Sequence, residues 1–492
     1  MQNRMSTPLR IFKNFSVRFV GRILSIIISI VVMAMVGRYL REAGYGEYAF
    51  WYNLIFVLQM FSDVGLQVII VREIAKCREK VSSFFGDAIF LKGLLSALFI
   101  VVTLLVGYLI IPEPSMPFLI IIVLAAVIQP SQDISTWIFR GIEAMEYEAI
   151  LTVFSQTVWI GCIYLFISRD LGIAHLLAAQ LVANLLRTIL GFAILLAKGI
   201  KPSFRINWTH YKGLLITSLP LGIAFITSMT YNYVNIALLK WFAQPEDIAS
   251  FNIGLAVTSG FLFIAVTLTT SFFPVFSRYV HEKDGRLPSF YAQVSKYLAI
   301  IAAPISVGLI FLADKIIALA FHHGFSDSIV CLQVLSVTLI FRFFNRMYHF
   351  VFPASDHQTR YLKHQLAGIV ANVILSFILI PRYQYLGACM AFIAGEMVLF
   401  LLNYLVMSRI IAPLPFFTVF IKPLSASLAM GAVLFFFQGM NFVPLFTVAL
   451  LVYPISLLVV RAFTFEEIKF IREILRFRKA TTMVKGDIES HE

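Results

Sequence analysis

Long apolar stretches follow one another along almost the whole of this 492-residue chain. An α-helix that crosses the hydrocarbon core of a bilayer needs about 20 predominantly apolar residues, because each residue advances the helix by about 1.5 Å. The sequence therefore predicts an all-α integral membrane protein with about 14 transmembrane helices. The predicted spans are 15–36, 48–71, 87–111, 116–139, 148–168, 173–197, 212–239, 248–277, 289–312, 328–352, 361–381, 384–408, 415–438 and 443–461.

Composition excludes a soluble globular fold. Hydrophobic residues make up 60% of the chain and charged residues 13%, whereas soluble domains are about 25% charged. The net charge of +13 is spread between the apolar stretches and forms no single basic patch, so we expect no nucleic-acid partner. The four cysteines show no metal-binding spacing, so we expect inert, buried thiols and neither a metal nor a cofactor. They are Cys77, Cys162, Cys331 and Cys389.

The distribution of Lys and Arg predicts the orientation in the membrane. Cytoplasmic loops of membrane proteins carry the excess of these residues. With both termini in the cytoplasm, the inner loops and the two tails hold most of them and the outer loops hold few. We therefore expect a multi-pass protein of the inner or plasma membrane with both termini cytoplasmic. The cations left on the outer face are Arg38, Arg41, Arg169, Lys240, Lys315 and Arg382.

The residues after the last predicted span have a different pattern. Thr464 and Glu467 are spaced as a capping box, and apolar residues then recur at helical spacing among Lys and Arg. We expect an amphipathic helix over 464–480 that lies on the cytoplasmic membrane surface, followed by a flexible tail over 481–492.

An internal repeat is visible in the outer turns. GRYLREAGYGEYAF (37–50) has a counterpart in KWFAQPEDIASFNIG (240–254): a cation before an aromatic residue, then an acidic residue, then a small residue ahead of a second aromatic one. ISRDLGIA (167–174) likewise resembles IPRYQYLGA (380–388). Both pairs are separated by roughly 200 residues, which predicts a duplicated unit of six spans.

An even number of spans gives both copies the same orientation, as in transporters built from parallel repeats. We expect one six-helix lobe over 1–200, a second over 212–409, and two additional transmembrane helices over 415–461. Two such lobes that face each other enclose a central cavity able to open to either side of the membrane.

The first outer hairpin has two interpretations. Its glycines allow a tight turn and its tyrosines suit the aromatic belt at the membrane interface, which favours a purely structural role. A direct contact of Arg38 or Arg41 with a substrate is the alternative.

Several cations lie inside the predicted spans. An ionisable side chain at membrane depth is costly, so it normally faces a cavity or a partner. A cavity lined by more cations than acids attracts an anion such as phosphate or pyrophosphate. Internal ion pairs, for example of Asp63 with Arg22 or Lys92, are the alternative, as is snorkelling to the cytoplasmic surface. The cations that we assign to the cavity are Arg22, Lys92, Arg187, Arg342 and Arg346.

Three acidic residues, Asp63, Asp133 and Glu396, lie at similar depth. A carboxylate in a dry cavity can take up and release a proton near neutral pH, so these residues are candidates for coupling to H+ or Na+. For each one taken singly, a structural hydrogen bond is the favoured interpretation. The polar run Gln129–Gln132 beside Asp133 predicts a broken helix. Predicted span 7 carries the polar residues Asn232 and Asn235.

The chain as a whole resembles the oligosaccharide-lipid flippases of the polysaccharide-transporter type, which include O-antigen flippases. They share a superfamily with the multidrug and toxin extruders and the lipid II flippases. The resemblance covers nearly the whole chain. The motifs that carry it are GRYLREAGYGEYAF, DVGLQVIIVREIAK (63–76), FRGIEAMEYEAI (139–150), SLPLGIAFITSMTYNYVNIALL (218–239), TLTTSFFPVFSRY (267–279), and Leu375–Pro381 followed by LGA.

This resemblance implies two six-helix lobes arranged as a V, followed by two further helices. It implies that a polyprenyl-pyrophosphate-linked oligosaccharide, a repeat unit of O-antigen, capsule or exopolysaccharide, moves from the inner to the outer leaflet by alternating access without ATP. The implied partners are that lipid-linked oligosaccharide, membrane lipids, H+ or Na+, and a glycan polymerase and glycosyltransferases. Many relatives carry an aspartate in span 7 where this chain has Asn235, which weakens cation coupling at that point.

Two other functions are alternatives. A cation-coupled multidrug extruder uses the same scaffold, but its cavity is expected to be acidic and aromatic. A membrane glycosyltransferase or glycan polymerase needs a catalytic acid or base on a sizeable loop, usually with a metal. The predicted outer loops are short, and the sequence contains no Walker-type phosphate-binding motif. We therefore expect a transporter and not an enzyme.

Overall fold

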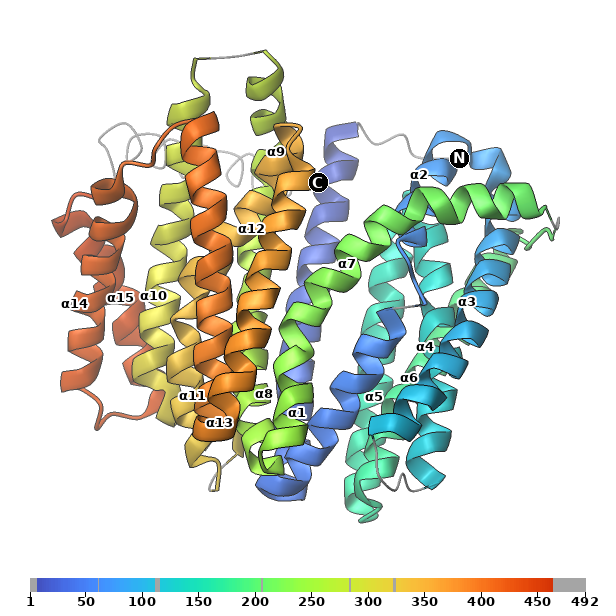
Figure 1. Ribbon diagram of the computed structural model, residues 1–492, viewed down its shortest axis with the longest axis horizontal. Coiled ribbons are helices and arrows are strands. Elements are labelled where there is room, and N and C mark those ends of the chain that lie inside the picture. The colour runs from blue at the N-terminus through green and yellow to red at the C-terminus, as the bar shows by residue number, and fades with distance from the viewer. Residues whose placement is uncertain are drawn as a thin grey trace, which may run out of the picture. The chain divides into compact units, whose positions relative to one another are not determined.

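The computed structural model describes residues 7–60, 62–110, 116–204, 207–282, 285–321 and 324–462 (Figure 1). Within these ranges every regular element is a helix. The predicted surface helix 464–480 and tail 481–492 lie outside the described residues. The elements are α1 (Thr7–Met60), α2 (Leu66–Lys76), η1 (Arg78–Lys80), α3 (Val81–Ile110), α4 (Met116–Gly141), α5 (Met145–Ser168), α6 (Gly172–Ala197), α7 (Trp208–Phe242), α8 (Pro245–Gly260), α9 (Leu262–His281), α10 (Leu287–Phe321), α11 (Ser326–Ser336), α12 (Thr338–Ala354), α13 (Gln358–Ile410), η2 (Phe417–Ile421), α14 (Lys422–Phe436) and α15 (Phe442–Val459).

The described helices include nine that are long and apolar enough to cross a membrane. The bent pair α11 and α12, which meet at 46°, brings the number to ten if it counts as one span. The all-helical membrane class predicted from the sequence is therefore confirmed. The longest of these candidate segments, Gln358–Ile410, has 53 residues, far more than the roughly 20 that one crossing needs.

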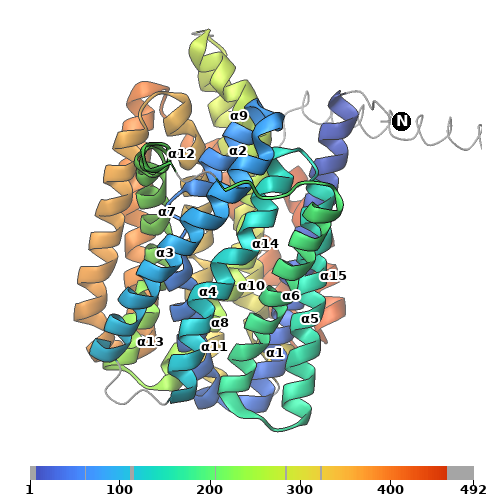
Figure 2. The same cartoon turned by 90° about the vertical axis from the view of Figure 1, so that its right-hand side faces the viewer.

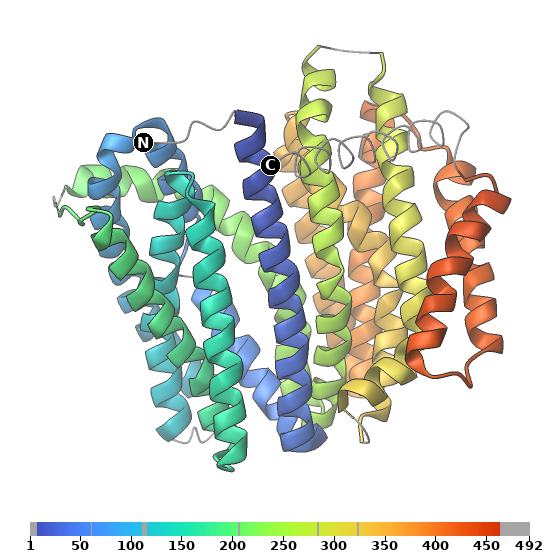
Figure 3. The same cartoon turned by 180° about the vertical axis from the view of Figure 1, so that it is seen from behind.

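Two long helices reverse direction at a single residue. Arg41 in α1 has φ 58° and ψ −173°, and Gln384 in α13 has φ 50° and ψ −127°. A positive φ is unfavourable for a residue with a side chain and cannot continue a right-handed helix. The ribbon of α1 turns back at its lower end (Figure 3). Both residues fall inside the predicted outer turns 37–50 and 380–388, so each long helix contains two of the predicted spans.

One span that was predicted to be continuous is broken. In predicted span 48–71, α1 ends at Met60 and α2 begins at Leu66, with left-handed backbone at Val64 and Gly65. Hydropathy does not detect this break, because the residues on either side are equally apolar. Predicted span 248–277 stays one apolar segment: α8 and α9 meet at Phe261, whose φ of −81° and ψ of −15° are helical, and Pro245–His281 is one candidate span.

The predicted break at Gln129–Gln132 is wrong, because α4 runs without interruption from Met116 to Gly141 and contains Pro130. Proline is tolerated inside membrane helices where side-chain groups bond to the neighbouring backbone carbonyls. Here Ser131 donates to the carbonyl of Ile128, and Gln59 of α1 donates at 3.5 Å to the carbonyl of Gln129.

The chain forms two compact units. Unit 1 comprises 1–260, 317–332 and 362–398, and unit 2 comprises 261–316, 333–361 and 399–492. In unit 1, α3, α4, α5 and α6 lie side by side (Figure 2). Apolar side chains of α2, α3 and α4 form a buried core, with Trp137 and Phe139 almost fully buried.

Unit 2 has its own apolar cores. Helix α9 packs beside α12, and α14 packs beside α15. Val307 of α10, Met430 of α14 and Leu445 of α15 belong to one buried cluster. Large apolar side chains of α14 and α15 are exposed, among them Phe436 at 81% and Val459 at 76%, as expected for helices that face lipid.

Candidate functional site

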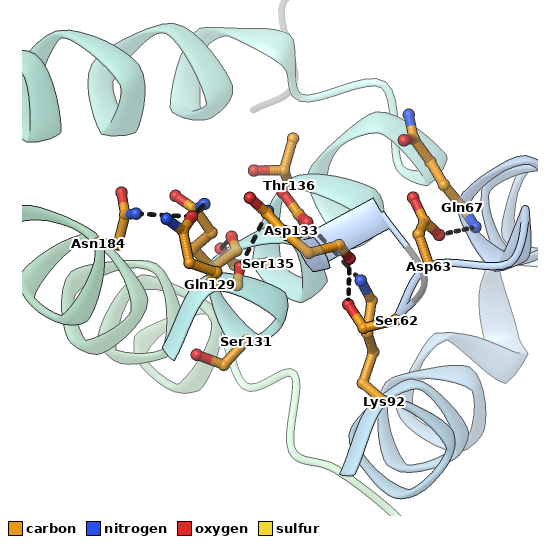
Figure 4. Close-up of polar contacts among 12 residues, drawn as sticks. Ser62, Asp63, Gln67, Lys92, Gln129, Ser131, Asp133, Ser135, Thr136 and Asn184 are labelled. Carbon is orange, nitrogen blue, oxygen red and sulfur yellow. Dashed lines mark hydrogen bonds and ion pairs between the residues drawn. The ribbon is translucent and has the colours of Figure 1, made fainter. Parts of the chain in front are cut away.

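Charged side chains of α3 and α4 meet inside unit 1. Lys92 is 2% exposed, and its Nζ lies 3.7 Å from Oδ2 of Asp133. Figure 4 shows the two side chains directed toward each other. The same Nζ lies 4.6 Å from the ring centroid of Trp137. Lys92 is therefore held by an internal ion pair and an aromatic face.

Asp63 lies in the turn between α1 and α2. Its Oδ1 accepts a 3.4 Å hydrogen bond from the backbone N–H of Gln67, in the first turn of α2, where the helix dipole favours a negative charge (Figure 4). Gly222 of α7 packs against this turn, and a Cβ at Gly222 would lie 2.4 Å from the carbonyl carbon of Val64. The break is thus a defined structural feature that places a carboxylate in the field of Lys92.

Arg187 on α6 approaches the same place. Its Nη2 donates to Oγ1 of Thr136 at 3.2 Å, and its strongest attractive charges are Asp133 and Glu148. Its buried Nε finds no acceptor among the described residues. A buried N–H without an acceptor is costly, so this donor is available to water or to a bound anion.

Arg140 and Glu148 form a pair that the sequence analysis did not single out. Nε and Nη2 of Arg140 donate to the two carboxylate oxygens of Glu148 at 3.0 Å and 2.6 Å. The turn 142–144 between α4 and α5 brings them together. A sequence signal for this pair exists in FRGIEAMEYEAI, where Arg140 and Glu148 lie on opposite sides of the turn 142–144.

The described charges of this cluster are balanced. The cations Lys92, Arg140 and Arg187 stand with the acids Asp63, Asp133 and Glu148. This cluster of three cations and three acids therefore carries no excess of positive charge. Two buried donors of the cluster have no hydrogen-bond acceptor within the described residues, Nε of Arg187 and Nζ of Lys92.

A row of amide side chains continues the polar interior. Gln180 donates to Asn184, Asn184 donates to Oε1 of Gln129, and Gln132 donates to the same oxygen. The polar run 129–132 therefore joins α4 to α6 and does not break α4. Gln180 and Asn184 were not among the predicted site residues. Gln180 lies four residues before Asn184, and Asn184 lies three residues before Arg187, so the three share one face of α6.

The other predicted site residues lie elsewhere. Arg22 is exposed on α1, and the described residues offer it no ion pair. Asn235 is fully buried, accepts from Ser376 at 2.9 Å and donates to the carbonyl of Ala388 at 3.4 Å. Glu396 is buried on α13. The side chain of Asn232 lies outside the described residues. Arg342, which is buried, and Arg346, which is half-buried, belong to α12 in unit 2.

The first outer hairpin makes many contacts within unit 1. Arg38 donates through Nε to the carbonyl of Ala320 at 2.6 Å and through Nη2 to that of Leu319 at 2.5 Å, at the end of α10. Arg41 is exposed at the reversal of α1. Lys240 Nζ lies 2.6 Å from Glu47 Oε2. These contacts support the structural interpretation of the hairpin.

Taken together, the helices define a multi-pass membrane protein with the fold of solved membrane exporters. A structure of the lipid II flippase MurJ in an inward closed conformation matches 94% of this chain and 100% of its own, with a TM-score of 0.73 and 16% identity. An inward-facing multidrug resistance transporter of the MATE family, in the MOP superfamily, matches 80% of this chain and 98% of its own, with a TM-score of 0.64 and 16% identity.

Sequence comparison supplies the family. The family described as "Polysaccharide biosynthesis protein" matches residues 11–280, more than half of the chain. The capsular polysaccharide biosynthesis protein CapF of Staphylococcus aureus is 22% identical over 409 residues, which are 81% of this chain and 99% of that relative. The chain belongs to this polysaccharide biosynthesis family, and it has the fold of a multi-pass membrane protein.

Proposed function

We propose that this protein is a flippase that moves a polyprenyl-pyrophosphate-linked oligosaccharide, a repeat unit of O-antigen, capsule or exopolysaccharide, from the inner to the outer leaflet. The observation that carries the proposal is the family match in polysaccharide biosynthesis on a chain whose fold matches a lipid II flippase over 94% of its length. Transport proceeds by alternating access, with the headgroup inside the protein and the lipid chain in the bilayer.

The order of elements supports two parallel repeats of six spans. The first half contains the two parts of α1 with the break before α2, and then α3, α4, α5 and α6. The second half contains α7, the segment formed by α8 and α9, α10, the bent pair α11 and α12, and the two parts of α13.

With α14 and α15 added, this correspondence gives 14 spans, in lobes 1–200 and 212–409 and two additional helices over 415–461. Both termini then lie in the cytoplasm of a cell-membrane protein. Reporter fusions after Gly172 and after Glu143 test this orientation. The turn at Gly172 is expected outside the cell, and the turn at Glu143 is expected in the cytoplasm. A cytoplasmic signal from the Gly172 fusion would reverse the assignment.

Contacts of the first outer hairpin support a state that is closed on the outer side. The hairpin belongs to the first proposed lobe, whereas Lys240, which pairs with Glu47, and Asn252, which donates to the hydroxyl of Tyr45, belong to the second. The lipid-linked substrate is proposed to load from the cytoplasmic side.

The pyrophosphate is proposed to bind the cations that retain free hydrogen-bonding capacity. Arg187 has an unfilled Nε, and Arg22 is exposed without an ion pair among the described residues. Lys92 contributes less directly, because Asp133 and the Trp137 ring already hold it. In unit 2, the roles of Arg342 and Arg346 on α12 stay predictions from the sequence. Asp63, Asp133 and Glu396 are the proposed carriers of a coupling H+ or Na+.

The experiment compares surface glycan and the lipid-linked intermediate in a strain that lacks this gene. Arg187→Ala and Arg22→Ala are expected to lower surface glycan at least tenfold and to accumulate the lipid-linked intermediate, since each removes a charged hydrogen bond to phosphate. Arg169→Ala, an exposed cation in an outer turn, is the matched control. Full surface glycan with both variants, at normal protein levels, refutes the assigned roles.

The multidrug extruder is a second candidate because a MATE transporter has the same fold. The balanced cluster in unit 1 gives no acidic excess for a cationic drug. A proteoliposome assay with a fluorescent polyprenyl-pyrophosphate glycan and a cationic dye separates the two functions. Glycosyltransferases and a glycan polymerase are the expected partners, because they supply and consume the lipid-linked repeat unit.

A further inference from the structure

Two buried cysteines from distant parts of the chain touch each other in unit 1. Cys331 lies on α11 and Cys389 lies on α13, and both side chains are fully buried. Their Sγ atoms are 3.5 Å apart. Disulfide-bonded sulfurs are about 2 Å apart, so the two thiols are in contact but not bonded.

The two thiols lie at matching depth. Cys331 is five residues beyond Ser326, where α11 begins, and Cys389 is five residues beyond the reversal at Gln384. Since a helix rises about 1.5 Å per residue, each thiol lies about 8 Å below the same end of the helices. In the proposed orientation this is the outer end, which faces an oxidising compartment in many cells.

We propose that Cys331 and Cys389 form a disulfide that ties α11 to the second part of α13. The two thiols lose two protons and two electrons to an oxidised disulfide donor, such as a thiol–disulfide oxidoreductase on the outer side of the membrane. One S–S bond forms in this protein, and the disulfide of the donor is reduced to two thiols. Exchange takes place during insertion, before packing excludes the donor from the buried sulfurs.

The bond would join segments that already converge on the start of α8. Ser328 of α11 donates to Ser250 of α8 at 3.2 Å. The backbone N–H of Tyr385 in α13 donates at 3.4 Å to Asp247 of α8. A covalent tie between α11 and α13 holds these three segments together as one body, against which the first outer hairpin closes.

This inference rests on the proposed orientation of the helices, but not on the identity of the transported substrate. Cys77 and Cys162 serve as internal references, because both are half-buried and have no cysteine partner among the described residues. They are expected to remain free thiols.

The experiment counts free thiols in full-length protein taken directly from cells. Membranes are quenched with a small permeant maleimide, the protein is denatured, and the added mass is measured with and without prior reduction. The wild type is expected to take two labels without reduction and four after it. Cys331→Ser is expected to take three without reduction, and the Cys77→Ser/Cys162→Ser variant none.

Four labels on most unreduced wild-type chains overturn the disulfide. The reporter fusion after Gly172 is measured in the same strain. Four labels with that reporter outside refute the disulfide alone, whereas four labels with the reporter inside refute the orientation as well. The label count does not depend on glycan transport, so the flippase proposal can fail while the disulfide stands.

Discussion

Glu47 and Lys240 form an ion pair with 2.6 Å between Oε2 and Nζ, although 193 residues separate them in the sequence. Glu47 follows the reversal of α1, and Lys240 lies in the last turn of α7. Lys240 also lies 5.2 Å from the ring centroid of Phe50. The pair therefore fastens the first outer hairpin to the end of α7, within unit 1.

Breaking this pair should loosen the outer closure. Both side chains are about a third exposed, so the pair is worth roughly 1 kcal/mol, which corresponds to about a fivefold change in the closed population. Lys240→Met and Glu47→Gln are expected to raise by that factor the labelling rate of an Ala249→Cys reporter, which is fully buried in α8. The charge-swapped variant Glu47→Lys/Lys240→Glu should restore protection. Equal labelling in all variants would show that the pair does not hold the closure.

The Lys92–Asp133 pair should respond unequally to the loss of its two partners. Asp133→Asn leaves the ammonium of Lys92, at 2% exposure, without a counter-ion, and such a buried charge costs about 3–5 kcal/mol. Lys92→Met leaves Asp133, whose side chain is 33% exposed and can reach water, so it costs less. The double variant Lys92→Met/Asp133→Asn removes both charges and should be more stable than Asp133→Asn. Thermal unfolding in detergent ranks the three, and a double variant as unstable as Asp133→Asn would contradict the pairing.

The Arg140–Glu148 pair should depend on geometry as well as charge. Arg140→Lys keeps the charge, but a single ammonium cannot reproduce the two parallel hydrogen bonds to Glu148. We expect Arg140→Lys and Glu148→Gln to lower the unfolding temperature by similar amounts, because each removes the same bidentate contact at the turn between α4 and α5. Arg78→Lys, at an exposed pair with Glu143 near the same turn, is the control and should change little. A larger effect at Arg78 would reverse this ranking.

Sequence reasoning captured the features that hydropathy and turn chemistry determine. The reversals at Arg41 and Gln384 fall inside turns predicted from charge, glycine and aromatic residues between apolar stretches. It missed the break at 62–65, although Ser62, Asp63 and Gly65 interrupt an apolar run there, because three polar or small residues leave mean hydropathy high. It also placed a break near Pro130, where α4 is continuous.

Partner choice among buried charges could not be predicted, because it depends on how helices pack. The sequence offered Asp63 as a partner for Arg22 or Lys92, and the structure pairs Lys92 with Asp133 on the neighbouring helix. In the sequence, Arg140 and Glu148 have the pattern of ordinary loop charges. In the structure, the turn between α4 and α5 brings them into an ion pair. The roles of the predicted site residues stay predictions, whereas their pairing required the fold.

Close approach of the first outer hairpin to α8 gives a prediction that rests on sterics alone. A Cβ at Gly46 would lie 1.7 Å from the carbonyl oxygen of Pro245, where no real contact is possible. Since that oxygen belongs to the backbone, the hairpin itself must shift to admit an alanine. Gly46→Ala is therefore expected to lower the unfolding temperature by several degrees and to raise the labelling of the Ala249→Cys reporter.

The matched control is Gly161→Ala in the middle of α5, where a Cβ meets nothing within 4 Å. That change should be neutral or stabilising, because alanine favours a helix over glycine by about 1 kcal/mol. Equal stability of the two variants would mean that the hairpin and α8 do not meet as closely as the structure places them.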